Sequence, residues 1–411
     1  MKRLTKIQKI ILNKLVFSLG VLFLIRFGTF LPVPGIDHND LAFYIQRHST
    51  TKSLISTFAG TDTFVIGLFT LNIFPYINAT ILVQLLVGLF PSLANLQKEG
   101  DLEGRRIITT LTRYFTLGWA FIQSISISLY LRQILFNWNF LFGLEIVLWL
   151  VTGAMIVLWL SEMITDYGLG NGASLLIYTN KEAPLPNLFM KLISENSGNF
   201  NLNSSLVILF VVLLSFYGII FLQSGIRKIN LISSRQLNQE SWEEDDSYYL
   251  PLRFNQAGVM PIILSTAFLV LPNYIINLGI FPWLNFLSSF KFLYWIGYFG
   301  LILLSSFFYS SIVIKPKDLS DQLQKMAVTI PGIRPGIQTT FYLQRVIKRV
   351  TLIGATMLAI ITILPNFIES TLSITGLTGL STTSLLILIG VLFDLKREIE
   401  NISYSNGSRY K

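Results

Sequence analysis

Residues 329–350 read TIPGIRPGIQTTFYLQRVIKRV, a charged loop that lies between two strongly apolar runs. Two Pro-Gly steps, at 331–332 and 335–336, break any helix across its tip, so Arg334 stands on a stiff turn. Three basic residues then recur at a spacing that places them along one side of a helix: Arg345, Lys348 and Arg349. The next apolar run begins at Val350. A basic helix end that adjoins a membrane span is typical of a docking loop on the cytoplasmic side.

The composition around this loop indicates a membrane protein. Of 411 residues, 52% are hydrophobic and 13% are charged, and the mean hydropathy is +0.60. Apolar runs of about 20 residues recur along the chain, which is the length a helix needs to cross a bilayer core of about 30 Å. The segments of about 10 alternating residues that a lipid-facing barrel requires do not occur in the sequence. We therefore predict an all-α, polytopic membrane protein.

The sequence predicts about ten spans, with the fifth interrupted by Lys181, Glu182 and two prolines. Of the 31 Lys and Arg residues, 24 fall on the side of both termini, which assigns that side to the cytoplasm or stroma. The basic N-terminus runs into a segment long enough to span, without a small-residue cleavage signature, so no cleavable signal peptide is expected. The spans are expected near 10–31, 70–90, 107–131, 141–164, 171–192, 204–225, 256–275, 293–314, 350–367 and 372–393.

An inverted pair of five-helix halves, 1–200 and 201–411, would fit ten spans, although no internal repeat is visible in the sequence. The second half carries two cytoplasmic loops, 225–255 and 315–349. Residues 54–69, LISTFAGTDTFVIGLF, are too short and too rich in Gly and Thr to span alone. They form either a re-entrant half-helix, which needs protein or water around it at membrane depth, or an interfacial loop helix.

The sequence lacks the residues and motifs that several classes of function require. With no cysteine, disulfides, thiol catalysis and cysteine-based metal sites are impossible. The two histidines fall in one loop, and neither a metalloprotease motif, a nucleophile elbow nor a phosphate-binding loop occurs. We expect no enzyme activity, cofactor or metal.

A secondary transporter of a small solute stays the alternative. Transporters usually place ionisable groups at the membrane midplane, and nearly all span centres of this sequence lack such groups.

Six stretches, in order and over almost the whole chain, resemble the channel subunit of the Sec protein translocon, the SecY family. They are RFGTFLPVPGID at 26–37, LNIFPYINATILVQLL at 71–86, GLGNGASLLI at 168–177, PLRFNQAGVMPIIL at 251–264, PGIRPGIQTTFYLQRVIKRVTLIGA at 331–355 and TSLLILIGVLFDLKREIE at 383–400. NWNF at 137–140 and the stretch LQKEGDLEGRRIITTLTRYFTLGWA look more like plastid-encoded members. The resemblance implies two pseudo-symmetric five-helix halves around a central pore.

The family closes its pore with a ring of mostly isoleucines and a short plug helix. Such an apolar constriction loses its water when empty and yields to a passing chain. The resemblance assigns the plug to 54–69. It assigns the ring to Ile77, Ile81, Ala173, Ile177, Ile263 and Ile387, where Ala173 departs from the pattern and loosens the collar on its side. Without the resemblance, an isoleucine in a membrane helix is most often a core or lipid-facing residue.

The resemblance also implies a lateral gate and a docking face. Gln84 and Asn255 match polar positions of the gate, although ordinary hydrogen bonding between helices would explain them too. Arg227, Lys228, Arg334 and Tyr342 match the face that binds a motor ATPase or a ribosome, unless the charges serve only to set topology.

The resemblance implies that the chain moves unfolded polypeptides across the membrane and inserts membrane proteins into it. The expected partners are SecE and SecG-like small subunits, the SecA motor ATPase, the ribosome, unfolded precursors and the lipid bilayer. The expected location is the plastid thylakoid membrane, with a bacterial plasma membrane as the alternative.

Overall fold

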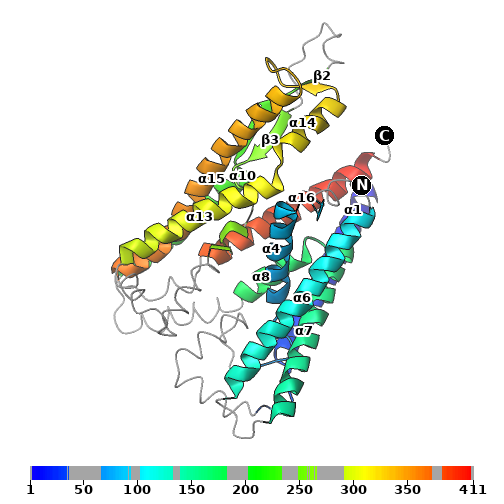
Figure 1. Ribbon diagram of the computed structural model, residues 1–411, viewed down its shortest axis with the longest axis vertical. Helices are drawn as coiled ribbons and strands as arrows, with labels where there is room; N and C mark the ends of the chain where they lie inside the picture. Colours follow the sequence, from blue (N-terminus) through cyan, green and yellow to red (C-terminus); the bar gives the residue numbers. More distant parts are fainter. Residues whose placement is uncertain are drawn as a thin grey trace. The chain divides into compact units, whose positions relative to one another are not determined.

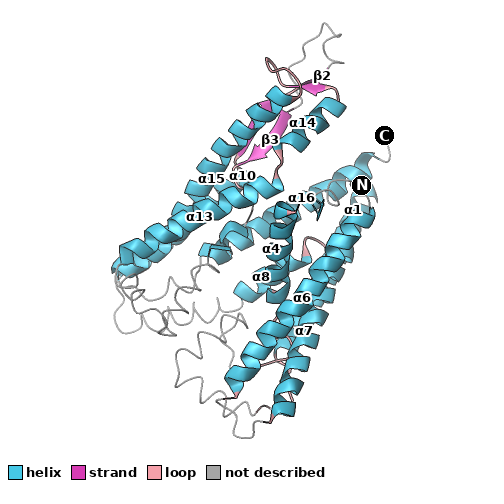
Figure 2. Cartoon of the chain, viewed as in Figure 1, coloured by secondary structure: helices cyan, strands magenta, loops and turns pink. Residues whose placement is uncertain are grey.

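The computed structural model describes fourteen helices and strands within two compact units (Figures 1 and 2). The units are Met1–Asn187 with Val391–Lys411, and Leu188–Gly390. The residues that the structure describes are 2–34, 36, 66–90, 92–93, 102–132, 139–182, 202–233, 249–256, 258, 260–262, 264–265, 291–372 and 382–408.

The first unit is a group of helices built on α7 (Phe140–Tyr167). Helix α6 (Leu102–Leu131) lies along α7 and also packs against α4 (Phe74–Leu89), as Figure 1 shows. Helices α1 (Lys2–Thr29) and α8 (Gly172–Glu182) pack on α7 as well. The last helix, α16 (Thr382–Ser408), contributes its residues from Val391 onward.

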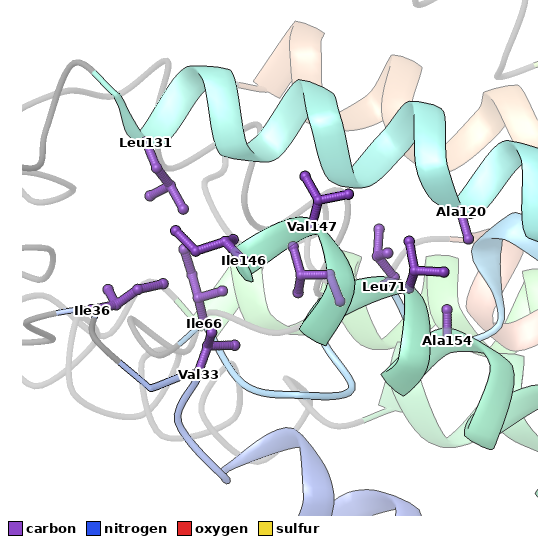
Figure 3. Packing of buried hydrophobic residues seen from close by; sticks show 11 residues of the cluster. Val33, Ile36, Ile66, Leu71, Ala120, Leu131, Ile146, Val147 and Ala154 are labelled. Carbon is purple, nitrogen blue, oxygen red and sulfur yellow. The ribbon is translucent and has the colours of Figure 1, made fainter. Parts of the chain in front are cut away.

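The core of this unit joins α6 and α7 to the short stretches on either side of the segment 37–65. Figure 3 shows that the side chains of Val33, Ile36 and Ile66 turn toward those of α7. Between membrane helices such packing stabilises chiefly through van der Waals contacts, because lipid is as apolar as the core. The cluster consists of Val33, Ile36, Ile66, Leu71, Ala120, Leu131, Ile146, Val147, Leu150, Val151 and Ala154.

Residues 66–73, which precede α4, are held tightly against α1 and α7. Pro32 and Gly67 form an antiparallel bridge, in which the Leu68 amide donates to the Leu31 carbonyl at 2.8 Å. A Cβ atom on Gly153 of α7 would lie 1.9 Å from the Leu68 carbonyl oxygen, so only glycine permits this approach. The stretch 66–73 is therefore a fixed support for the start of α4.

The second unit combines three long helices with two small sheets. Helix α15 (Ile337–Leu372) packs against α10 (Leu202–Ser224), α13 (Lys291–Val313) and the amphipathic α14 (Pro316–Lys325). Strand β1 (Ile226–Asn230) pairs antiparallel with β3 (Tyr249–Arg253), with Arg227 opposite Leu252. Strand β2 (Ile232–Ser233) pairs antiparallel with β4 (Val328–Thr329). The second sheet thus ties the two predicted cytoplasmic loops together.

The predicted fold class is confirmed, and the two sheets add structure where we expected only loops. Within the described residues, four helices are long and apolar enough to cross a membrane: Gln8–Thr29, Phe140–Tyr167, Trp295–Lys325 and Ile337–Pro365. Two shorter apolar helices cover Phe74–Gly88 and Phe210–Ser224. The expected spans 171–192, 256–275 and 372–393 extend beyond the described residues, so the number of ten and the division into halves at residue 200 stay predictions.

The basic end of the loop, from Ile337 onward, and the apolar run behind it form one continuous helix. Helix α15 contains Arg345, Lys348 and Arg349, all exposed, and continues through the apolar run to Leu372. Of the predicted plug, residues 54–65 lie outside the described part of the chain. Its last four residues, 66–69, form the bridge and a turn and are not helical.

Candidate functional site

Four of the six predicted ring residues lie on two helices of the first unit. Ile77 and Ile81 are one turn apart on α4 and are 4% and 8% exposed. Ala173 and Ile177 are one turn apart on α8 and are half-buried. Ile387, on α16, is buried and belongs to the second unit, and Ile263 lies outside the described residues. The structure therefore places two pairs at helical spacing, and the complete ring stays a prediction.

The start of α8 is fixed by hydrogen bonds at its first turn. Asn171 is the capping residue, and its Oδ1 accepts from the amides of Ala173 and Ser174 at 3.0 and 3.4 Å. The Gly172 amide donates to Thr165 Oγ1 of α7 at 3.0 Å, and a Cβ there would meet the Ser161 carbonyl at 2.0 Å. This close approach to α7 determines where Ala173 lies.

The turn between α7 and α8 is also tied to two other helices, α1 and α16. Ser18 Oγ of α1 accepts a hydrogen bond from the Leu169 amide at 2.8 Å. Glu398 of α16 accepts from the Gly170 amide and pairs with Lys14 of α1 at 3.8 Å. Helices α1 and α16 thus help to position the turn from which α8 begins.

The two predicted gate residues belong to different units. Gln84, on α4, has a buried Oε1 atom without a hydrogen-bond partner among the described residues. Asn255 follows β3, and its buried Nδ2 atom likewise finds no partner in the described part of the chain. Asn255 lines a cavity of about 10 Å³, room for about one water molecule, together with Gln256, Ser310, Thr351 and Gly354. Their pairing across a gate stays a prediction.

The residues beside Asn255 are anchored to α13 and α15. Ser310 Oγ donates to Gln256 Oε1 at 3.1 Å and lies 2.8 Å from Thr351 Oγ1. The Phe254 carbonyl would lie 2.0 Å from a Cβ on Gly354, so the chain passes directly over α15 there. The start of the predicted seventh span is therefore held at a defined point.

The four predicted docking residues lie in one module of the second unit, here called the loop module. It comprises β1, β3, α14, β4 and the first turns of α15. A common core holds these elements together because each contributes or adjoins a buried aliphatic side chain. Its buried members are Ile229, Leu252, Leu323, Ile330, Leu343 and Ile347.

Each docking residue has a defined place on this module. Arg227 and Lys228 are exposed on β1, and the Lys228 ammonium lies 4.7 Å from the centre of the Tyr249 ring, a cation–π geometry. Arg334 is exposed on the tip of the turn, where Gly332 and Gly336 adopt φ of 76° and 102°. Tyr342 is half-buried against the module core.

Hydrogen bonds make the Arg334 turn rigid. Thr339 Oγ1 donates to the Arg334 carbonyl at 3.0 Å, and Ser320 Oγ of α14 donates to the Gly336 carbonyl at 3.0 Å. The positive φ angles are of the kind that glycine adopts without steric cost. The turn therefore presents the Arg334 guanidinium to solvent from a stiff support, as the sequence predicts.

Sequence reasoning missed two groups of residues. Asn72 and Asn180 form a buried side-chain hydrogen bond across 108 positions, which only the three-dimensional arrangement reveals. Arg113 of α6 and Glu162 of α7 form a two-pronged ion pair with N–O distances of 2.9 Å. The spacing of charged residues in the sequence could not single out Arg113 as the partner of Glu162.

Comparison with known proteins identifies the family. The SecY family model matches residues 67–396. A protein translocase subunit SecY from Trieres chinensis is 59% identical over 409 residues, covering 96% of each chain. One from Synechococcus elongatus is 40% identical, covering 97% of this chain and 93% of the relative.

Solved structures agree with this assignment at the level of the fold. A structure described as "The structure of a protein conducting channel" superposes with a TM-score of 0.62 at 16% identity, covering 96% of this chain and 93% of that chain. One described as "Sec61 in the Canine ribosome-channel complex from the endoplasmic reticulum" gives a TM-score of 0.58 at 16% identity, covering 96% and 93%. This chain belongs to the SecY family.

Proposed function

We propose that this chain is the protein-conducting channel subunit of a Sec-type translocase. It moves unfolded polypeptides across a membrane and releases apolar segments sideways into lipid. The observation that carries the proposal is the family match over residues 67–396, which includes the helices that bear Ile77, Ile81, Ala173 and Ile177. The transporter alternative has no comparable support.

The ring chemistry supports a seal against ions. Ile77 and Ile81 are branched and uncharged, and an apolar constriction excludes ions by dewetting while a passing chain displaces its side chains. Ile177, Ile263 and Ile387 complete the proposed ring, and Ala173 is its smallest member. Residues 54–69 are the proposed plug.

The loop module is the proposed docking face. The Arg334 guanidinium can pair in two-pronged fashion with carboxylates of a protein or with phosphates of RNA. Arg227 and Lys228 add exposed positive charge on the same module, so it suits the SecA motor ATPase or a ribosome. Energy for transport would come from such a partner.

The proposed setting is the thylakoid membrane of a plastid, with a bacterial plasma membrane as the alternative. Relatives from the alga Trieres chinensis and from cyanobacteria support this setting. SecE and SecG-like small membrane subunits are the proposed permanent partners. Gln84 and Asn255 are the proposed polar residues of the lateral gate.

Reconstitution tests the function directly. Vesicles that hold the chain with its co-purified subunits should protect an unfolded precursor from protease when motor ATPase and ATP are added. Protection should be lost without ATP. Ion-coupled uptake of a small solute, with no precursor protection, would contradict the channel function and indicate a transporter.

A further inference from the structure

We propose that Asn72 and Asn180 are a pair of positioning residues that hold α4 and α8 together beside the predicted ring and keep the resting channel tight. The pair deepens the proposed function and rests on it. Asn72 Nδ2 donates to Asn180 Oδ1 at 2.7 Å, and the two residues are 1% and 6% exposed. The bond is therefore fully enclosed by protein.

The backbone at Asn72 is shaped for this bond. Asn72 adopts a left-handed φ of 46°, which residues other than glycine adopt infrequently and asparagine more readily than most. Its Oδ1 accepts from the amide of Ile73 at 2.8 Å, so the same side chain caps the turn that leads into α4. Asn72 also belongs to the segment 66–73, which is fixed against α1 and α7. Its Nδ2 donor is thus aimed from a rigid base.

The bond lies close to the ring residues of both helices. Ile77 is in the first turn of α4, directly after Asn72 and its turn. Ile177 is three residues before Asn180 on α8, so the two side chains share one side of that helix. In the predicted topology the amide pair lies on the non-cytoplasmic side of these isoleucines.

Helices α4 and α8 pack mainly on different helices, so the amide bond is a direct link between them. Helix α4 packs chiefly on α6, whereas α8 packs chiefly on α7. The Asn72–Asn180 bond joins the supports of Ile77 and Ile177 directly. Loss of the bond should let these isoleucines separate and admit ions more often.

The two amides differ in how well they are paired. Asn180 Nδ2 is buried and finds no partner among the residues that the structure describes. Without Asn72, the Asn180 amide would be left buried with neither end paired, which is costly in a membrane interior. The effect of the bond therefore has to be separated from the effect of an unpaired amide.

The test measures leak of chloride from vesicles that hold the complete channel with its co-purified subunits. Asn72→Gly keeps the left-handed backbone without strain and removes the amide, and Asn180→Leu keeps the volume and removes the partner. Each variant should raise the leak about fivefold, the ratio that corresponds to about 1 kcal/mol for one hydrogen bond between membrane helices. The double variant should leak no more than either single variant.

Ser128→Ala is the matched control. Ser128 Oγ donates to the Gly143 carbonyl at 3.0 Å, a buried bond that joins α6 to α7 in the same unit. Its loss should leave the leak at the wild-type level. Three results would each overturn the proposal. They are a leak from Ser128→Ala as large as that from the asparagine variants, a wild-type leak from both asparagine variants, and additive effects in the double variant. Precursor protection in the same vesicles reports the channel function separately. Failure of the amide-pair proposal can therefore be told from failure of the proposed channel function.

Discussion

Arg334 illustrates how a single residue can be exposed and yet well positioned. Its carbonyl accepts from Thr339, the glycines at 332 and 336 take the left-handed turns, and its guanidinium stays in solvent. The cost of ordering the side chain on binding is lower when its backbone is already fixed. An arginine in this setting suits recognition of a planar anionic partner.

Reversing the charge of Arg334 should block transport without unfolding the protein. In Arg334→Glu, the proposed docking face loses one positive charge and gains a negative one that repels carboxylates and phosphates. We expect normal membrane insertion and a loss of precursor protection of at least about tenfold, the scale of one lost charge-assisted contact. Arg106→Glu makes the same charge change at an exposed residue of α6, outside the loop module, and is the control. Normal transport by Arg334→Glu, or equal loss in Arg106→Glu, would contradict the docking role.

At the scale of elements, helix placement depends on a few close backbone approaches. Gly153 lets α7 touch the segment 66–73, and Gly354 lets α15 touch the chain at Phe254. Other helical glycines, such as Gly118 and Gly300, have no atom within 4 Å of the Cβ position. Glycine therefore fulfils a packing requirement at some sites and merely occupies an open face at others.

Substitutions at two of these glycines should separate the two cases. Gly153→Ala places a methyl group 1.9 Å from the Leu68 carbonyl, so α7 or the segment 66–73 must move. We expect a loss of about 1–3 kcal/mol of stability, as for other overpacked sites. Gly118→Ala on α6 should be neutral or gain about 0.5–1 kcal/mol, because alanine favours a helix. Thermal unfolding in detergent checks both, and equal midpoints for the two variants would refute the close approach.

The loop module depends on its own small core. Leu343→Ala removes a fully buried side chain and should destabilise the module by about 2–5 kcal/mol. We expect faster protease cleavage in the loop 225–255, with the helix α7 of the first unit unaffected. Phe341→Ala, on the same helix with 63% of Phe341 exposed, is the control and should leave the cleavage rate unchanged. Similar cleavage of both variants would mean that Leu343 does not hold the module together.

For the whole molecule, the sequence predicts the class and much of the helix order because apolar length is a local property. The membrane class, the basic end of α15 and the rigid Arg334 turn all follow from residues near one another in the chain. The β2–β4 pairing and the Asn72–Asn180 bond do not, because each joins segments about 100 residues apart. The same limit applies to the bridge between Pro32 and Gly67, where a glycine in the sequence could as well have marked a turn.

In the proposed function, a polypeptide passes through an apolar constriction lined by the ring isoleucines. The chain contains no cysteine, so single cysteine variants have no background. Ile81→Cys and Ile177→Cys report the ring, and Leu148→Cys, on an exposed face of α7, is the control. The measurement is disulfide cross-linking of each variant to a precursor that carries one cysteine and is halted in mid-passage. We expect cross-links at Ile81→Cys and Ile177→Cys and none at Leu148→Cys, whereas cross-linking only at Leu148→Cys would mean that the ring does not line the path.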